Sequence, residues 1–222
     1  MVELAGTRVL AVLTRAPSAG GKTRLFAGLG VPPDPRLLSA LLLDTIDGAA
    51  ASGVSIVVAV TPASACDEVR ALLRDSQAPH ADVIAQPDGD LGERMRATMA
   101  ALFARGASAV ALIGSDLPHI DGASIVEALA ALADDPAAVI LGPARDGGYY
   151  LIAATRVPDV FDPIEWGTSR VLEQTSGLAA DRGLPIRLIA TLDDVDGVDG
   201  LRRAAAGGRA PRTLAWIRAT LQ

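Results

Sequence analysis

The 222-residue sequence is short of the residues on which several common kinds of site depend. Its one cysteine, Cys66, excludes an internal disulfide and a cysteine-based zinc cluster. Its two histidines, His80 and His119, are too few and too far apart for a histidine-rich metal site. Aromatic residues make up 3% of the chain against a hydrophobic content of 50%, so the core must consist mostly of Ala, Val, Leu and Ile.

Two further absences concern location and partners. No apolar stretch is long enough to span a membrane, and the start of the sequence lacks the basic region of a signal peptide, so we expect a cytoplasmic protein with no membrane span. A net charge of −6 argues against a nucleic-acid partner. An acidic protein that handles phosphates would need local positive groups and a divalent cation. Nothing in the sequence indicates the oligomeric state.

Apolar segments of strand length alternate with segments of helical pattern along the chain, whose length fits one domain over residues 1–222. This alternation predicts the α/β class, as a Rossmann-like α/β/α sandwich with a mixed, mainly parallel sheet. "GGYYLIAA" follows "VILGPARD" too closely for a helical crossover, so we expect one antiparallel strand there. The expected strands are Arg8–Thr14, Val54–Val60, Asp82–Ala85, Ala109–Gly114, Ala138–Gly142, Tyr149–Ala153 and Pro185–Thr191. The expected helices are approximately residues 35–51, 62–74, 90–105, 121–133, 169–182 and 211–221.

The only lysine, Lys22, lies in a glycine-flanked turn after the first expected strand, whereas arginine occurs 19 times. A compact ammonium at this point indicates a phosphate ligand. "APSAGGKT" is close to the phosphate-binding loop G-x-x-x-x-G-K-[ST], with Ala16 at the opening glycine. The glycines and prolines of residues 28–33, however, would end a following helix after a turn or two. We therefore expect loop amides, Arg15, Lys22 and Arg24 to hold nucleotide phosphates; a P-loop NTPase and a solvated lysine are the alternatives.

Three aspartates are candidate metal ligands. Asp116 ends the buried-type strand in "VALIGSD", where a carboxylate can coordinate Mg²⁺ or Mn²⁺ that also touches a diphosphate. The alternative for Asp116 is a turn residue. Asp194 and Asp196 in "TLDDVDGVDGL" lie on one side of an extended segment, which suits a hard cation. The alternative there is a solvated turn, in which Asp199 caps a helix.

Two other motifs could contact the rest of a substrate. "GPARDGGYYLI" and "EWGTSR" combine a carboxylate with glycines that allow close approach and with aromatic surface. They predict an acceptor pocket, although Asp-Gly-Gly is also a common hairpin turn. Its candidate residues are Asp146, Gly147, Gly148, Tyr149, Trp166 and Thr168.

The segment "QPDGDLGERM" follows the third expected strand. Its residues Gln86, Asp90 and Arg94 could contact a nucleobase or a ribose of the nucleotide. The alternative is that Asp90 and Glu93 only form the capping box of the next helix.

Several of these segments, in this order, resemble a bacterial family of the nucleotide-diphospho-sugar transferase superfamily. They are "RAPSAGGKTRL", "GDLGERM", "GSDLP", "DGGYYLI", "WGTS" and "DDVDGVDGL", and they extend from about Arg8 to Leu201. Members of that family are often named glycosyltransferases, or transferases associated with radical-SAM proteins. The resemblance implies a GT-A fold and a relation to phospholactate and molybdenum-cofactor guanylyltransferases.

The resemblance also implies roles for particular residues. The first loop, with Arg15, Lys22 and Arg24, would bind the nucleotide phosphates, and Asp116 would bind the metal. Asp196 resembles the second metal-associated position. The sequence departs from relatives in having "GSDLP" instead of D-x-D and a glycine after Asp196 where relatives often carry threonine.

Three functions are compatible with these residues. The first is a glycosyltransferase, in which Lys22 and the metal stabilise the departing nucleoside diphosphate while Asp146 contacts acceptor or sugar hydroxyls. The second is a nucleotidyltransferase that joins an NTP to a phosphorylated small molecule; it needs more positive charge, which Arg94 and Arg145 could supply. The third is a non-catalytic nucleotide-binding module. The expected partners are thus a nucleotide sugar or an NTP and a small-molecule acceptor.

Overall fold

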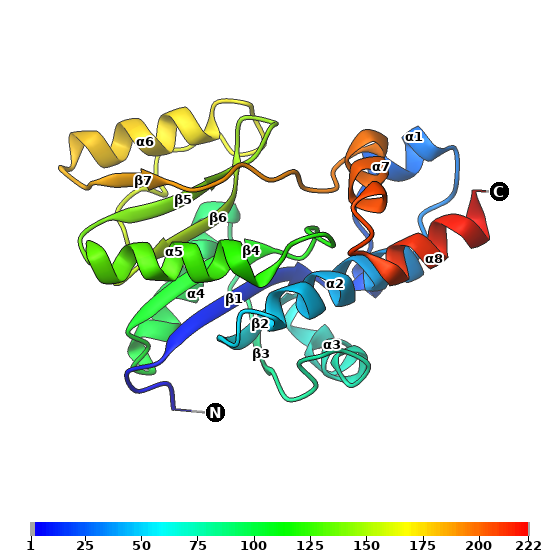
Figure 1. Ribbon diagram of the computed structural model, residues 1–222, viewed down its shortest axis with the longest axis horizontal. Coiled ribbons are helices and arrows are strands. Elements are labelled where there is room, and N and C mark those ends of the chain that lie inside the picture. The colour runs from blue at the N-terminus through cyan, green and yellow to red at the C-terminus, as the bar shows by residue number, and fades with distance from the viewer. Residues whose placement is uncertain (1–2, 222) are drawn as a thin grey trace.

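A mixed seven-stranded sheet forms the centre of the computed structural model, which describes residues 3–221 (Figure 1). The strand order is β3-β2-β1-β4-β6-β5-β7. Only β6 runs against its neighbours β4 and β5, and the other pairs of neighbours are parallel. The strands are β1 (Arg8–Arg15), β2 (Ser55–Thr61), β3 (Asp82–Ala85), β4 (Ala109–Gly114), β5 (Val139–Pro143), β6 (Tyr149–Ala154) and β7 (Ile186–Leu188). The predicted mixed, mainly parallel sheet with one antiparallel strand is confirmed.

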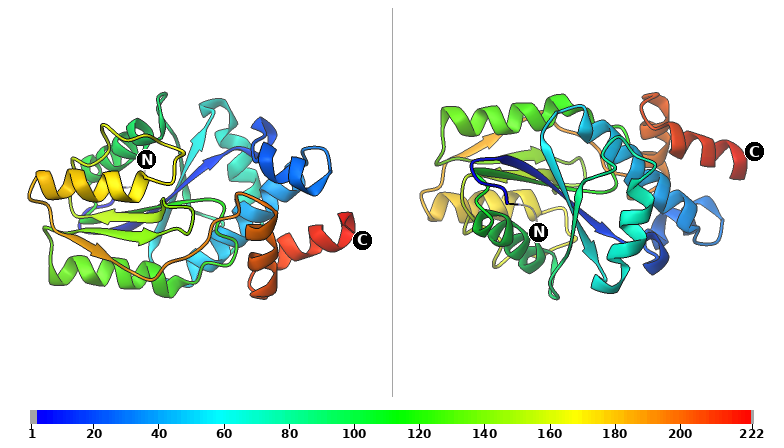
Figure 2. Two further views of the ribbon diagram at one scale, coloured as in Figure 1. Left: turned by 90° about the horizontal axis from the view of Figure 1, so that it is seen from above. Right: turned by 90° about the horizontal axis from the view of Figure 1, so that it is seen from below.

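Helices cover both faces of the sheet, as Figure 2 shows from above and below. One face packs against α2, α3 and α5, and the other packs against α4 and α6. The helices are α1 (Thr23–Leu29), α2 (Pro35–Ala50), α3 (Cys66–Leu73), α4 (Leu91–Ala104), α5 (Gly122–Asp134), α6 (Val171–Asp181), α7 (Val198–Ala206) and α8 (Pro211–Thr220), with short 3-10 turns η1 (Pro17–Ala19) and η2 (Ala63–Ala65). None of these helices is both long and apolar enough to cross a membrane.

The continuous apolar runs of the central strands follow from burial on both faces. In β1, Leu10 and Val12 belong to the core on the α2 face, whereas Val9 and Ala11 belong to the core on the α4 face. All four side chains are fully buried. The sequence pattern therefore distinguishes strand from loop well, because these positions tolerate only apolar residues.

The direction of β6 decides what gathers at one edge of the sheet. The carboxyl ends of the parallel strands meet at this edge, where ligands bind in open α/β sheets. Because β6 runs the other way, its first residue lies at the same edge, next to the end of β5. The loops after β1, β4 and β7 and the turn between β5 and β6 therefore converge there.

A satellite core lies beyond this edge and was not predicted from the sequence. It packs α1 and α2 against α7 and α8, around Phe26, Leu37, Leu201 and Trp216. These helices extend the molecule at the right of Figure 1. Helix α7 was missed because Gly197, not Asp199, is its N-cap, so that the expected capping side chain stands inside the first turn.

Two other boundaries differ from the prediction. The segment that begins at Pro62 first forms the 3-10 turn η2, and α3 begins only at Cys66. Strand β7 ends at Leu188 instead of Thr191. Beyond it the segment stays attached to β5 by single hydrogen bonds, from the Ile189 N–H to the carbonyl oxygen of Leu141 and from the Leu192 N–H to that of Pro143, and Leu192 forms an isolated bridge with Ala144.

The predicted start of α4 is confirmed: Asp90 and Glu93 form a reciprocal capping box.

Candidate functional site

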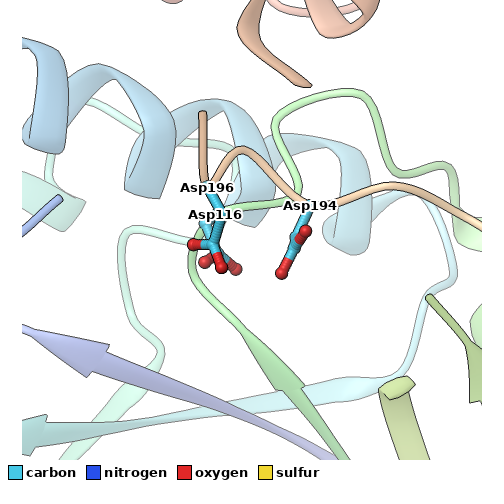
Figure 3. Close-up of side chains that lie close together, drawn as sticks. All are labelled: Asp116, Asp194 and Asp196. Carbon is cyan, nitrogen blue, oxygen red and sulfur yellow. The ribbon is translucent and has the colours of Figure 1, made fainter. Parts of the chain in front are cut away.

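Three carboxylates meet where the segment after β7 passes the loop that follows β4 (Figure 3). Asp116, Asp194 and Asp196 each offer an oxygen, and these oxygens lie within 4.8 Å of one another. Asp116 and Asp196 are far apart in the chain and come from different strand ends. The structure therefore brings together the three aspartates that the sequence indicated as candidate metal ligands.

The backbone around Val195 explains the orientation of its two neighbours. The Val195 side chain is fully buried in the satellite core, so that Asp194 and Asp196 on either side turn the other way. The Val195 N–H donates a hydrogen bond to the carbonyl oxygen of Asp116, at 3.0 Å. This bond joins the two segments that carry the carboxylates.

Gly114, the last residue of β4, leaves the space that Asp116 occupies. A Cβ atom at Gly114 would lie 2.6 Å from Oδ1 of Asp116, closer than real contacts allow. The sequence analysis did not single out this glycine, although a glycine just before a candidate ligand at a strand end is the signal that could have found it.

Lys22 reaches the same carboxylates from the loop after β1. Its Nζ lies 2.5 Å from Oδ2 of Asp116 and also forms an ion pair with Asp196. Burial by itself would lower the pKa of Lys22, but the two carboxylates raise it overall and keep the ammonium charged. Lys22 has φ of 51° and is the one non-glycine residue with a positive φ among residues 3–221. Such left-handed positions persist where the surroundings hold them, often at functional sites.

The charge balance at this point favours an additional cation. Burial raises the pKa of Asp194 to about 7, and repulsion from Asp116 and Asp196 adds to the effect. One ammonium thus faces three carboxylates. Oxygen ligands at this mutual distance fit Mg²⁺ or Mn²⁺, which prefer carboxylates.

Two adjoining cavities open on either side of the carboxylates. The first, which we call the basic cavity, has a volume of about 450 Å³ and is lined by the loop after β1 together with Asp116 and Asp196. Arg15, Lys22 and Arg24 all line it. Arg15 and Arg24 are exposed and form no ion pair with any residue of the described chain. Positive charge is therefore available on this side for an anion.

The second cavity, which we call the aromatic cavity, has a volume of about 350 Å³ and shares Arg15, Asp116 and Asp196 with the first. It extends along the ends of β1, β4 and β6 to the start of α4. Its side next to β6, called here the β6 side, is lined by Asp146, Gly148, Tyr149, Trp166, Thr168, Val171 and Asp194.

An aromatic pair forms one wall of the β6 side. The rings of Tyr149 and Trp166 meet edge to face, with centroids 6.4 Å apart and planes at 78°. Oδ1 of Asp146 accepts a hydrogen bond from the N–H of Gly148, at 2.8 Å, which fixes the carboxylate at the turn. The Thr168 hydroxyl donates to the carbonyl oxygen of Glu165 and accepts from the N–H of Arg170 at 3.4 Å, so its oxygen is only partly engaged as an acceptor.

Gly147 has a different place from the one expected, since it does not line either cavity. Its φ is +91°, and a Cβ atom there would lie 2.1 Å from the carbonyl oxygen of Ser169. Its own carbonyl oxygen accepts from the N–H of Leu172. The glycine is thus needed for packing: it lets the β5–β6 turn approach the segment that carries Trp166.

The group after β3 also needs a correction. Asp90 lines neither cavity, and its carboxylate caps α4. Gln86 and Arg94 do line the aromatic cavity. The Gln86 amide nitrogen donates to the carbonyl oxygens of Thr14 and Ala59, so it joins β1 to β2, and the amide oxygen is the atom of this side chain that could still contact a nucleotide.

Asp193 is a residue of the site that the sequence analysis did not select. Its side chain is 11% exposed and pairs with Arg145 at 3.1 Å and with Arg203 at 2.6 Å. These partners come from the β5–β6 turn and from α7. Asp193 therefore ties both elements to the segment that carries Asp194 and Asp196.

Comparison with known proteins defines the class to which this fold belongs. A proposed nucleotide-diphospho-sugar transferase from Desulfovibrio desulfuricans G20 superposes with a TM-score of 0.76 at 27% identity, over 96% of this chain and 98% of the other. Rv0371c from Mycobacterium tuberculosis H37Rv, solved with manganese, gives 0.51 at 20% identity over 90% and 98%. CMP:2-keto-3-deoxy-manno-octonic acid synthetase, solved with CTP, gives 0.53 at 18% identity over 92% and 99%. The fold is that of nucleotide-diphospho-sugar transferases.

The chain belongs to a bacterial family described as "uncharacterized protein conserved in bacteria" (DUF2064), which it matches over residues 45–168. The matched segment contains Asp116 and the β5–β6 turn, but neither Lys22 nor Asp196. No curated protein matches the chain.

Proposed function

We propose that the protein is a metal-dependent transferase that uses a nucleotide-activated donor, and that it transfers a sugar from a nucleotide-diphospho-sugar. The observation that carries this proposal is the meeting of Lys22 with Asp116 and Asp196 beside two unpaired arginines. A diphosphate and a divalent cation together are the ligand that such a mixture of charges suits.

The basic cavity would hold the phosphates. Lys22 is a point charge, and Arg15 and Arg24 offer planar forks that can bind phosphate oxygens in pairs. These groups bind the diphosphate and stabilise the negative charge that grows on it as it leaves.

Asp116, Asp194 and Asp196 would hold the divalent cation, since their oxygens gather at one point. A cation bound there supplies Lewis-acid stabilisation of the diphosphate. The ammonium of Lys22 contacts two of the same carboxylates, so it would lie next to a phosphate bound to that cation.

The proposed step is a substitution at the anomeric carbon of the sugar. An acceptor hydroxyl oxygen forms a bond to this carbon, and the bond from carbon to the diphosphate oxygen breaks with its electron pair on that oxygen. The hydroxyl proton passes to the carboxylate of Asp146, the candidate base on the acceptor side, and from there to solvent. The products are the glycosylated acceptor and a nucleoside diphosphate.

Nucleotidyl transfer is the second candidate, because three cations around the basic cavity also suit a triphosphate. In that reaction an oxygen of a phosphorylated acceptor attacks the α-phosphorus of an NTP, and pyrophosphate leaves with the electron pair of the broken bond.

A thermal-shift screen of NTPs and nucleotide sugars, with and without Mn²⁺, tests the proposal. We expect a nucleotide sugar with Mn²⁺ to raise the melting temperature most. Calorimetric titration of Asp116→Asn should then show a loss of nucleotide affinity on the order of 100-fold, about 2.7 kcal/mol. The matched control is Asp181→Asn, an exposed carboxylate at the end of α6 outside both cavities.

Different outcomes would contradict different parts of the proposal. A larger shift with an NTP would favour nucleotidyl transfer. Nucleotide affinity of Asp116→Asn equal to that of the wild type would contradict the assignment of Asp116 as a metal ligand. Tight nucleotide binding without turnover of any donor would leave a non-catalytic binding module.

A further inference from the structure

We propose that the acceptor is an uncharged, hydroxyl-rich molecule with one apolar face, such as a sugar or a cyclic polyol, bound on the β6 side of the aromatic cavity. This inference rests on the proposed function and names the chemical class of its second substrate. It is carried by the distribution of charge and aromatic surface around that side of the cavity.

The charged side chains that line the β6 side are acidic. Asp146 lies at the turn, and Asp194 lies close enough for the Asp146 carboxylate to help raise its pKa. Arg94 lines the same cavity at the start of α4, outside the β6 side, and its Nη1 lies 3.4 Å from Oε1 of Gln86, whose amide is bound to β1 and β2.

Other nearby cations are also directed elsewhere. Arg145 follows directly before Asp146 in the chain, but its side chain is 73% exposed, pairs with Asp193 and does not line the cavity. Arg170 is paired with Glu165 and does not line the cavity either. Arg15, which forms no ion pair with any described residue, also lines the aromatic cavity, but on the side that it shares with the basic cavity, where the donor phosphates would lie. A phosphorylated acceptor on the β6 side would therefore meet the carboxylate of Asp146 with no cationic side chain among the residues that line this side, which is unfavourable in a partly buried place.

The same surface suits a polyol. The edge-to-face pair of Tyr149 and Trp166 offers apolar area against which the C–H face of a ring can pack. One oxygen of Asp146 is used by Gly148, and the other has no hydrogen-bond partner within residues 3–221. This oxygen and the remaining acceptor lone pair of Thr168 can receive hydrogen bonds from hydroxyl groups.

The two tryptophans of the chain allow a direct test. Trp216 is buried in the satellite core, whereas Trp166 lines the cavity, so fluorescence of Trp216→Phe reports on the cavity alone. We would titrate this variant with methyl β-D-glucopyranoside and with glucose 6-phosphate, in the presence of Mn²⁺ and the nucleoside diphosphate that stabilises the protein most. Trp216→Phe removes the hydrogen bond that Trp216 donates to Asp34. Saturation-transfer NMR with the same two ligands on the unaltered protein therefore repeats the comparison without this substitution.

We expect the neutral glucoside to change Trp166 fluorescence at concentrations at least tenfold below those needed for the phosphate. Asp146→Asn keeps the oxygen that accepts from Gly148 but removes the negative charge. It should strengthen the binding of glucose 6-phosphate and so reduce the difference in affinity between the glucoside and the phosphate. The control variant Asp181→Asn should leave this difference unchanged.

Equal or tighter binding of glucose 6-phosphate would overturn the inference, and so would the absence of any response to the glucoside. Thermal stabilisation by nucleotide and Mn²⁺ is measured separately, so failure of the inference and failure of the proposed transferase function are distinguishable.

Discussion

The basic cavity and the β6 side of the aromatic cavity adjoin the same carboxylates, but they are constructed differently. The cations of the basic cavity come from one continuous segment, residues 15–24, which runs from the end of β1 to the start of α1. The acids and rings of the β6 side come from three segments: the β5–β6 turn, the stretch around Trp166 and the segment after β7. The cations of the basic cavity can thus be encoded by one short stretch of sequence, whereas the β6 side of the aromatic cavity depends on tertiary packing of three segments.

The difference has consequences for how each wall can be damaged. A substitution in the loop after β1 removes charge but leaves other elements in place. A substitution that moves the β5–β6 turn displaces several side chains at once.

Gly147→Ala should disturb the β6 side most. The added Cβ atom meets the carbonyl oxygen of Ser169 while φ stays in the left-handed region, so we expect a loss of about 2–4 kcal/mol of folding free energy. Denaturant unfolding measures it. Trp166 fluorescence should shift in the same variant, because the added Cβ atom displaces Ser169 and with it the segment that carries Trp166.

Gly183→Ala is the matched control for this substitution. Gly183 also has a positive φ, +64°, but no atom lies within 4 Å of the position of its Cβ. It should lose only the conformational part, about 1 kcal/mol. If the two variants were equally unstable, the close contact with Ser169 would have no energetic role.

Lys22→Ala should damage only the basic cavity. We expect a tenfold loss of nucleotide affinity, about 1.4 kcal/mol, because the ammonium is one of three cations around the phosphates. Lys22→Arg should recover part of it, since the charge is kept but the shape is not. Calorimetry measures the affinity, with Arg218→Ala on the exposed side of α8 as control. An equal loss of glucoside binding would show that the two cavities act as one.

Asp194→Asn should have the smallest effect, and its sign depends on pH. The folded protein raises the pKa of this carboxyl from 3.8 to about 7, so its contribution to stability is present below about pH 4 and is lost as pH rises through about 7. An asparagine at this position does not ionise, so the Asn variant keeps its stability as pH rises. Without metal at about pH 8 its melting temperature should be higher by about 2–4 °C, which corresponds to about 1 kcal/mol after screening by solvent in the open cleft.

At about pH 3, below the unfolded pKa of 3.8, the wild-type carboxyl is protonated in both the folded and the unfolded protein, so the two proteins should melt together. Mn²⁺ should stabilise the wild type more than the variant. A variant that melts lower than the wild type at both pH values would show that Asp194 does not suffer the repulsion described above.

Much of the fold could be predicted because the central strands are buried on both faces. Runs such as "RVLAVLT" and "AVALIG" allow little besides a strand in the middle of a sheet. The placement of Asp116 and Lys22 also followed, since Asp116 stands two residues after such a run and Lys22 lies in the loop that follows another, and parallel strands end at one edge. Their roles as metal and phosphate ligands stay predictions.

The remainder depended on contacts that no local pattern encodes. The satellite core brings α7 against α1, which are far apart in the sequence, and the pairing of Asp193 with Arg145 and Arg203 has no spacing rule. Gly147 was predicted to contact a substrate, but its close approach is to another part of the chain. A glycine in a sequence can indicate a close approach, but it does not identify whether a substrate or another part of the chain makes that approach.

The contact of Lys22 with Asp116 and Asp196 has one more consequence. The lysine is a resident counter-ion, so a divalent cation that binds these oxygens exchanges with an ammonium instead of adding to bare carboxylates. The displaced ammonium then needs a new anion, which a phosphate group provides. If the proposed metal and nucleotide bind here, they would therefore be linked through a single side chain, and by thermodynamic reciprocity each would tighten the binding of the other by the same factor.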